Sequence, residues 1–576
     1  MTSLLHGRDL VRAFDHAAPG HARFPGAEPP RVAVVGGGIA GLAAATALAE
    51  RGIAVTLHER EAVLGGRVAG WPVRLADGST ATMSRGFHAF FRQYYNLRGL
   101  LRRTDPGLIR LAALPDYPLR HRSGLTDSFA RVPRTPPLSA AGFVLLSPTF
   151  GLRDLAALHA RAALPLLDVR VPEVFERYDD TSAHDFLERI NFPRAARHLA
   201  FEVFSRSFFT DPRHLSAAEL LLMFHIYFLG SSEGLLFDVP TEPYPQGLWQ
   251  PLAGYLGNLG VDLRTASPVD RVRPLADGDI EVVTAGRGAE RHQAVVLALD
   301  AGGLRRLVAA SEHLGGPRWR ADIAALRTAP PFLVSRLWLD RPVAAHRPGF
   351  LGTSGYDGLD NVSVLDRWEG EAARWAARTG GSVVELHAYA VDGDADRAGV
   401  QERMTARLHE VYPETRGARL VDVHHEWRGD CPVFPVGGWS RRPGVITPHP
   451  AVVLAGDLVR TDLPVALMER AATTGFQAAN VLLARWGVAG QTLWSVPRAG
   501  RCRPLRAVAW VSTTDPAPSP SAMRITTVRG PGAVNTARTG TTSRPATRND
   551  TSTANPSSPS PATRSGTSTP LRSVNA

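Results

Sequence analysis

The stretch RVAVVGGGIAGLAAATALAERGIAVTLHERE, which runs from Arg31 to Glu61, decides the fold. A run of valine and alanine predicts a buried strand at Val32–Val35, and three glycines separate it from an alanine-rich helix. A second apolar run, Ala54–His58, predicts the next strand, which is followed by an acidic residue. This order of strand, glycine turn, helix, strand and acid is typical of a dinucleotide-binding unit.

Each glycine of this unit, and the acid that ends it, has a physical role. Gly36 permits the tight turn, Gly38 lets the backbone approach a pyrophosphate, and Gly41 lets the helix close on the strand. The helix N-terminus then offers unpaired N–H groups and a positive dipole end to the phosphates. Glu59 is placed to accept hydrogen bonds from ribose hydroxyls.

Two further segments identify the dinucleotide. The acid is followed by REAVLGGRVAGW, in which a Gly-Gly-Arg turn ends at Arg67. Far downstream, AVVLAGDLVRTDLPVALMERAATTGFQAANVLL (451–483) reads as a strand, a loop and a helix rich in small residues. Together with the first motif, these segments resemble the flavin amine oxidase and carotenoid desaturase superfamily. The resemblance implies FAD as the cofactor.

The same resemblance implies roles for particular residues. Arg67 would lie over the pyrophosphate, Asp457 would hold the ribityl or phosphate end, and the helix starting near Val465–Glu469 would direct its positive end at the flavin. Small residues such as Gly475 would let that helix approach the cofactor. The predicted FAD-binding residues are Gly36, Gly38, Ile39, Ala40, Gly41, Glu59, Arg60, Gly66, Arg67, Gly456, Asp457, Val465 and Glu469.

The order of segments predicts an α/β fold of the amine oxidase or phytoene desaturase type. A Rossmann-like FAD-binding domain is built from discontinuous segments, and an α+β substrate domain is inserted between them. Strand-like stretches at 260–299, 332–340 and 382–390 alternate with helical, aromatic-rich stretches. The predicted boundaries are a disordered arm at 1–30, FAD-binding segments at 31–100, 236–304 and 426–490, substrate segments at 101–235 and 305–425, a C-terminal extension at 491–510 and a disordered tail at 511–576.

Composition excludes several classes of protein. All 65 basic residues are arginine, so a P-loop lysine or a lysine Schiff base cannot exist here. The net charge of +11 is scattered rather than gathered in a stripe, and we expect no nucleic-acid partner. Two cysteines predict neither a metal site nor a disulfide framework and favour a reducing cytoplasm. No secretory signal and no membrane-spanning run is expected.

Two stretches narrow the reaction. SRGFHAFFRQYYNLRGLLRRTDP (84–106) and GDLVRTDLPVALMERAATTG (456–475) closely resemble the bacterial β-carotene desaturase/methyltransferase family, also called isorenieratene synthases. The resemblance implies that β-ionone rings of β-carotene become aromatic by desaturation with an intramolecular methyl migration. Alternatives on the same fold are another carotenoid or isoprenoid desaturase, a ketolase, or a non-catalytic prenyl-binding chaperone.

This chemistry needs an apolar pocket that excludes water, aromatic faces to stabilise a cation, and a weak base. His88 is the candidate catalytic base, with a structural histidine bonded to backbone as the alternative. Phe87, Phe91, Tyr94 and Leu101 fall at helical spacings and form either plain core or a pocket wall.

Three other positions carry hypotheses with open alternatives. Arg85 either contacts FAD or forms a surface salt bridge, and Arg460 either pairs with Asp462 near the flavin or does not. His225 lies in an apolar run (217–230) that predicts a buried helix, where it is a core histidine.

The predicted partners are a carotenoid substrate and, as an open alternative, the membrane surface. The apolar stretch 138–158 either dips into a bilayer to collect the substrate or packs on the core. Many members of the superfamily use a lysine–water pair to assist reaction with oxygen. This chain has no lysine, which favours a quinone or another electron acceptor over oxygen. We expect a cytoplasmic protein, with peripheral contact to the cytoplasmic membrane left open.

Overall fold

The computed structural model describes residues 13–15, 17–197 and 208–507. The predicted tail at 511–576 lies outside the described residues, as do residues 1–12 and 16 of the predicted arm. Within these described ranges, no helix has the length and apolar character needed to cross a membrane.

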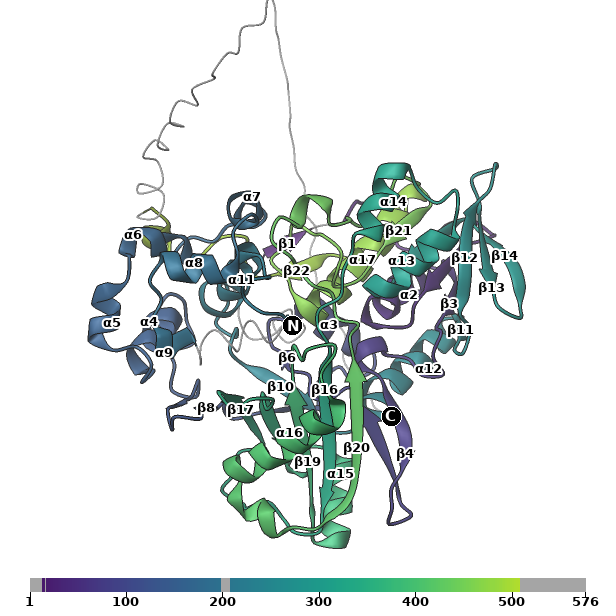
Figure 1. Cartoon of the computed structure of the whole chain (residues 1–576). Helices are drawn as coiled ribbons and strands as arrows, with labels where there is room; N and C mark the ends of the chain where they lie inside the picture. The colour runs from purple at the N-terminus through teal and green to yellow at the C-terminus, as the bar shows by residue number, and fades with distance from the viewer. Residues whose placement is uncertain (1–12, 16, 198–207, 508–576) are drawn as a thin grey trace, which may run out of the picture. The chain divides into compact units, whose positions relative to one another are not determined.

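A five-stranded parallel sheet holds the N-terminal motif (Figure 1). The central strand β2 pairs in register with β3 on one side and β15 on the other, and its valines are buried on both faces. Strands from three distant parts of the chain therefore share one sheet, as the discontinuous Rossmann-like fold predicts. The order is β11 (Asp262–Arg264), β3 (Ala54–His58), β2 (Arg31–Val35), β15 (Ala294–Leu297) and β21 (Val452–Leu454).

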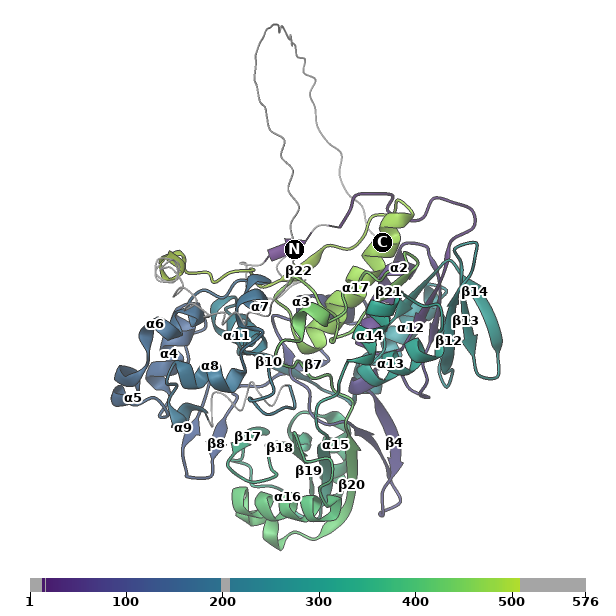
Figure 2. The same ribbon diagram turned by 45° about the horizontal axis from the view of Figure 1, so that its top comes forward.

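Helices α2 (Ile39–Glu50) and α17 (Leu467–Arg485) pack against each other and against this sheet (Figures 1 and 2). Their contact is close because Gly475 has no side chain: a Cβ there would lie 2.3 Å from the Ala40 carbonyl oxygen. The glycine therefore lets one helix approach the other, and its predicted role in the approach to the cofactor stays a prediction. Around the unit lie α3 (Tyr95–Leu101), α12 (Gln250–Asn258), α13 (Ala301–Ala310), α14 (Pro317–Ala324) and the sheet β12–β13–β14 (Val269–Pro274, Ile280–Thr284, Gly288–His292).

A seven-stranded mixed sheet forms the second half of the fold (Figure 1). Alternate residues of its strands face opposite sides. One face packs on α16 (Arg397–Val411), while the other meets α15 (Gly370–Thr379) and the hairpin β4–β5 (Gly70–Arg74, Thr80–Ser84). The order is β20 (Leu420–Arg428), β16 (Phe332–Leu339), β19 (Ser382–Ala388), β18 (Asn361–Val364), β17 (Phe350–Ser354), β8 (Leu119–His121) and β9 (Thr126–Asp127).

Short helices occupy the segment between β9 and β10 in the sequence. The apolar run at 217–230 is a buried helix, as predicted: α11 (Ala217–Phe224) continues into a π-turn at His225–Leu229. The other members are α4 (Leu138–Leu146), α5 (Leu152–Ala157), α6 (Ala160–Ala163), α7 (Glu173–Tyr178), α8 (Ala183–Arg189) and α9 (Arg194–Ala196). A small sheet joins β6 (Phe90–Phe91), β10 (Phe237–Pro240) and β7 (Leu111–Ala113).

The described part of the predicted disordered arm has a fixed path. Strand β1 (Ala13–Asp15) pairs antiparallel with β22 (Leu493–Ser495), which lies in the predicted C-terminal extension. Further along, the His21 N–H donates to the Gly487 carbonyl and the Ala489 N–H donates back to His21, both over 2.9 Å. Residues 13–15 and 17–30 are therefore ordered, because they add backbone hydrogen bonds at this edge. The exact domain boundaries stay a prediction.

Candidate functional site

The glycine turn after β2 is too tight for side chains. Gly36 has a φ of 112°, and a Cβ there would lie 2.2 Å from the Ala298 carbonyl oxygen. A Cβ on Gly41 would lie 1.8 Å from the Gly36 carbonyl oxygen, so α2 can close on the strand only with glycine at this position. The turn and the helix–strand contact thus depend on these two residues.

The first turn of α2 is suited to an anion. Gly38 is the N-cap, and within the described chain no side chain caps the turn and no acidic residue lies in it. Ile39 and Ala40 are buried. Because the first N–H groups of a helix lack intrahelical acceptors and carry a partial positive charge, a phosphate is the natural partner of this turn.

Glu59 closes the motif at the end of β3. Its Oε2 accepts a 2.6 Å hydrogen bond from the Gly37 N–H, and its Oε1 accepts one of 2.9 Å from the Glu61 N–H. The carboxylate is thereby fixed beside the glycine turn. Arg60 points elsewhere: it is exposed and ion-paired with Glu61.

The second glycine turn lies directly against the first. The Gly65 N–H donates to the Gly37 carbonyl over 2.9 Å, and a Cβ on Gly66 would lie 3.1 Å from the Gly38 Cα. Two turns without side chains therefore pack against each other, so that a ligand beside them could approach their backbone closely.

Arg67 and Asp457 bring the two predicted motifs together. The Arg67 Nη2 lies 2.5 Å from the Asp457 Oδ1, although the residues are far apart in the sequence. Such charge-assisted contacts are stronger than neutral hydrogen bonds. Both side chains also line the cavity described below.

The loop between β21 and α17 is held by hydrogen bonds between its backbone and side chains of α17. The Gly456 N–H donates to the Thr474 Oγ1 over 2.9 Å, and the Val465 carbonyl accepts from the Arg470 Nε over 3.0 Å. These contacts place the first residues of α17 in the cavity wall.

Glu469 is used within the fold. Its Oε1 accepts hydrogen bonds from the N–H and the side-chain amide of Asn96, each 2.8 Å long, and its Oε2 accepts one of 2.9 Å from the Leu97 N–H. The side chain is buried and satisfies donors at the start of α3. Glu469 therefore joins α17 to α3, and its contact with the cofactor stays a prediction.

A cavity of about 240 Å³ lies where the cofactor motifs meet the seven-stranded sheet. Its wall is mainly aromatic, and Arg67 and Asp457 reach it from the cofactor side. The start of α17 and the strands β17, β18 and β19 contribute further residues. The aromatic side chains of the wall are Phe87, Phe91, Tyr94, Tyr117, Phe209, Phe237, Phe332, Phe350 and Tyr389.

The predicted helix over the aromatic stretch is partly wrong. Residues 90 and 91 form strand β6, and helix α3 begins only at Tyr95, because β6 pairs with β10. Phe87 and Phe91 instead contact the rings of neighbouring aromatic residues. The ring centroids of Phe87 and Phe350, for example, are 4.3 Å apart. Both alternatives, plain core and pocket wall, apply to this set of residues. Phe91 and Tyr94 are buried and also line the cavity, whereas Leu101 is buried away from it.

His88 lies in the cavity wall beside Tyr244. Its Nδ1 is 2.9 Å from the Gly86 carbonyl oxygen, which therefore accepts the Nδ1 proton. Burial lowers the pKa of His88 to about 4, although the Gly86 carbonyl opposes this shift. The ring is neutral near pH 7, and within the described ranges its hydrogen bonds involve Nδ1 alone, so Nε2 keeps its lone pair.

The structure shows which residues contact the other candidates from the sequence. Arg85 is paired with Asp430 and also lines the cavity. Arg460 lies over the Trp439 ring, and Asp462 is exposed; in the part of the chain that the structure describes, no ion pair joins the two. His225, as predicted, is a buried core histidine, and its Nε2 lies 2.7 Å from the Pro497 carbonyl oxygen.

Comparison with known proteins identifies the family. The model of the flavin containing amine oxidoreductases matches residues 39–483. The chain belongs to this family. A triple mutant of putrescine oxidase shares the fold of this amine oxidoreductase, with a TM-score of 0.59 over 79% of this chain and 99% of that chain at 17% identity.

Within the family, the chain is similar to two carotenoid phi-ring synthases. The protein from Streptomyces griseus is 71% identical and spans 88% of this chain and 97% of its own length. The protein from Chlorobaculum tepidum is 27% identical and spans 82% of this chain and 91% of its own length. The predicted resemblance to the family of aromatising carotenoid enzymes is therefore confirmed.

FAD is the cofactor that this family of amine oxidoreductases implies, and the site fits it. The uncapped start of α2 and the two facing glycine turns suit a pyrophosphate. Glu59 lies where a ribose would be bound, and the Arg67–Asp457 pair reaches from there to the cavity. The assignment of individual residues to FAD stays a prediction.

Sequence reasoning missed the polar part of the cavity. The strand predicted at SVVELHAYA (382–390) forms over Ser382–Ala388, yet Glu385, His387 and Tyr389 were not singled out. Their alternation in an otherwise apolar strand was the signal, because residues two apart share one face of a sheet.

Proposed function

We propose that this flavin enzyme converts the β-ionone rings of a β-carotene-like carotenoid into aromatic rings of the isorenieratene type. The identity of 71% with the Streptomyces griseus carotenoid phi-ring synthase, over nearly its whole length, carries the proposal. The aromatic cavity beside the cofactor motifs supports it, because a carotenoid ring is apolar.

The residues of the cavity can serve three tasks in this reaction. Bound FAD supplies the acceptor for the hydride that leaves the ring. The faces of Phe87, Phe91 and Tyr94 stabilise the positive charge left on the ring and exclude water while a methyl group migrates. The free lone pair of His88 Nε2 takes a proton. A weak base suffices here, because ring cations are strong acids, and its low pKa keeps it unprotonated at neutral pH.

The decisive experiment is expression in a host that makes β-carotene, followed by mass and NMR analysis of the pigments. We expect products with fewer hydrogens, an unchanged carbon count and aromatic methyl signals. Ketone products would favour a ketolase, and unchanged β-carotene in cells that contain the flavin-loaded protein would contradict the proposal. A purified protein without flavin absorbance would favour the chaperone alternative.

We further propose that helix α4 contacts the membrane that holds the substrate. Leu138, Leu145 and Leu146 are 60%, 75% and 54% exposed, which is unusual for large apolar side chains on one short helix. The opposite side of the helix is anchored: Phe143 stacks on Phe129 with 5.2 Å between ring centroids. The exposed leucines therefore form a fixed apolar face.

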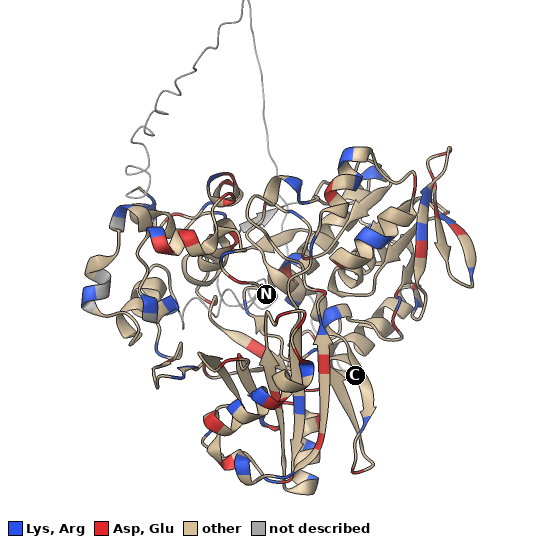
Figure 3. Cartoon of the chain, viewed as in Figure 1, with Lys and Arg blue, Asp and Glu red and all other residues tan. Residues whose placement is uncertain are grey.

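Basic residues frame this leucine face. Arg134 precedes α4 and Arg153 follows it, and both are exposed; Figure 3 shows basic positions on the neighbouring helices as well. Apolar and cationic groups side by side suit the interface of an anionic bilayer.

The membrane contact can be tested by sedimentation with vesicles. The Leu145→Glu variant should lose binding to phosphatidylglycerol vesicles, because a charge enters the apolar face. Leu420→Glu, at an exposed leucine 45% accessible on β20, serves as the matched control and should bind normally. Equal binding of both variants would contradict the proposal.

A further inference from the structure

Strand β19 and the residue that follows it carry a row of polar side chains beside the cavity. Glu385, His387 and Tyr389 alternate with Leu386 and Ala388, which face α16 in the apolar core of the sheet. His387 and Tyr389 line the cavity, and Glu385 lies behind them, fully buried. A buried polar row opposite an apolar substrate needs a reason beyond packing.

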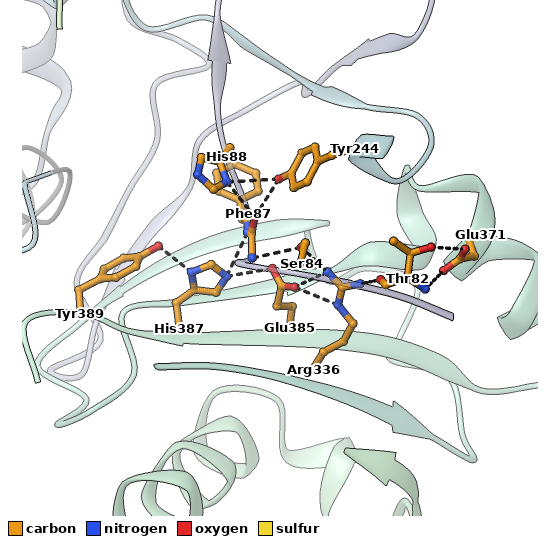
Figure 4. Close-up of polar contacts among 11 residues, drawn as sticks. Thr82, Ser84, Phe87, His88, Tyr244, Arg336, Glu371, Glu385, His387 and Tyr389 are labelled. Atoms are coloured by element: carbon orange, nitrogen blue, oxygen red, sulfur yellow. Dashed lines mark hydrogen bonds and ion pairs between the residues drawn. The ribbon is translucent and has the colours of Figure 1, made fainter. Parts of the chain in front are cut away.

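The three side chains form one chain of hydrogen bonds (Figure 4). The Tyr389 hydroxyl lies 2.8 Å from the His387 Nδ1, and the His387 Nε2 lies 2.9 Å from the Glu385 Oε1. An ionised carboxylate can only accept, so Nε2 carries the imidazole proton and Nδ1 accepts from the tyrosine.

Arg336 keeps the far end of this chain ionised. Its guanidinium contacts the Glu385 Oε2 at 2.6 and 3.0 Å and the Ser84 Oγ at 3.0 Å (Figure 4). Burial alone would raise the pKa of Glu385, but Arg336 and His387 outweigh it and lower the pKa to about 2. Burial raises the pKa of the Tyr389 hydroxyl, so this group stays protonated near pH 7.

The Tyr389 end of the cavity also holds polar atoms without partners. The Asn361 side-chain amide donates to the Tyr389 hydroxyl over 2.9 Å, which orients that hydroxyl toward His387. The Asn361 Oδ1 and the Ser354 Oγ are buried in the same wall and have no hydrogen-bond partner among the described residues. Unpaired buried polar atoms are costly, and they are common where a site is prepared for a ligand or a reaction.

We propose that Tyr389 is a catalytic residue that receives the last proton of each ring aromatisation, with His387 and Glu385 as positioning residues behind it. This inference rests on the proposed function. Aromatising one β-ionone ring removes two hydrides and two protons, so proton transfer is needed twice. His88 serves the first transfer and Tyr389 the second.

In the second transfer, a ring C–H bond of the final cation breaks, and its electron pair becomes the last double bond of the aromatic ring. The proton goes to the Tyr389 oxygen while the hydroxyl proton of Tyr389 moves to the His387 Nδ1. The resulting imidazolium is stabilised by the carboxylate of Glu385 beside it. Bound FAD would supply the acceptor for the hydride lost before this step.

The test uses the purified flavin-loaded protein with β-carotene in phosphatidylglycerol vesicles. Tyr389→Phe and His387→Gln should form the aromatic ring about 100-fold more slowly, and a carotenoid that has lost one hydride and one proton per ring should accumulate. Tyr412→Phe is the matched control, since Tyr412 is buried on the opposite face of the sheet and does not line the cavity. It should match the wild type in rate and product.

The outcomes separate this inference from the proposed function. A wild type that makes no aromatic product contradicts the proposed function itself. If the wild type aromatises and Tyr389→Phe does so at the same rate, or yields neither product nor intermediate while retaining FAD, the assignment of Tyr389 is wrong. Should Tyr389→Phe lose its flavin, fluorinated tyrosines at position 389 keep the shape and lower the phenol pKa. A rate that follows the phenol pKa supports the relay, and a constant rate overturns it.

Discussion

Replacement of Gly475 by alanine tests the contact between α2 and α17. A methyl group there would lie 2.3 Å from the Ala40 carbonyl oxygen and 2.9 Å from the Ala43 Cβ, whereas ordinary contacts are 3.4–4 Å. Overpacking of this kind costs about 1–3 kcal/mol, while alanine gains about 1 kcal/mol of helix propensity over glycine. We expect a net loss of up to about 2 kcal/mol in the free energy of unfolding, because the methyl group would meet a backbone carbonyl that cannot move aside easily.

Gly254 provides the matched control, because it lies inside helix α12 and a Cβ there would meet nothing within 4 Å. Gly254→Ala should therefore gain about 1 kcal/mol from propensity alone. The assay is urea unfolding followed by circular dichroism, with flavin fluorescence as a second probe, since flavin emission rises when the cofactor is released. If both variants shift stability in the same direction, the steric reasoning from the α2–α17 contact is refuted.

Four other outcomes are expected. Asp457→Asn should weaken FAD binding about 10- to 100-fold, because Arg67 loses a charged partner worth about 1.5–3 kcal/mol; titration of the apoprotein measures this, and unchanged affinity would count against the pair. His88→Gln should slow turnover about 10²- to 10⁴-fold, while His225→Gln, at a fully buried histidine that does not line the cavity, should retain it; equal pigment yields would rule out His88 as base. The free energy of unfolding should fall as the pH drops from about 6.5 to about 4, because burial lowers the pKa of both histidines to about 4 and the unfolded chain binds protons first; urea titrations at pH 7 and pH 5 check the sign, and a flat profile would contradict it. In stopped-flow experiments a quinone should reoxidise the reduced flavin faster than air, because the chain has no lysine, and the reverse order would exclude the quinone.

The cofactor half of the site was accessible to sequence reasoning because its signals are local. A glycine that must adopt a φ of 112°, or whose Cβ would meet a carbonyl at 1.8 Å, has no substitute. The spacing of Gly36 and Gly41 therefore reveals the turn without a structure. The motif around Asp457 could be read in the same way, since the strand and the helix on either side of it are regular.

The substrate half was not accessible, because its geometry depends on which strands become neighbours. Helical spacing described Phe87 and Phe91 poorly, since pairing of β6 with β10 overrides it. The contact of Glu469 with the start of α3 could not be foreseen either, because the two elements are far apart in the sequence. The row from Glu385 to Tyr389 gains meaning only when Arg336 is seen on the paired strand.

The interleaved order of the central sheet also affects how the chain is made. Strand β2 is synthesised early, yet the sheet is completed only by β21, and its covering helix α17 ends at Arg485. At about 5–20 residues per second, a ribosome needs roughly 20 to 90 s to cover that distance. The nascent chain therefore carries an unfinished apolar sheet through most of its translation. Efficient production should depend on chaperones or on slow synthesis, and loss of the last hundred described residues should leave an aggregating fragment rather than a smaller flavoprotein.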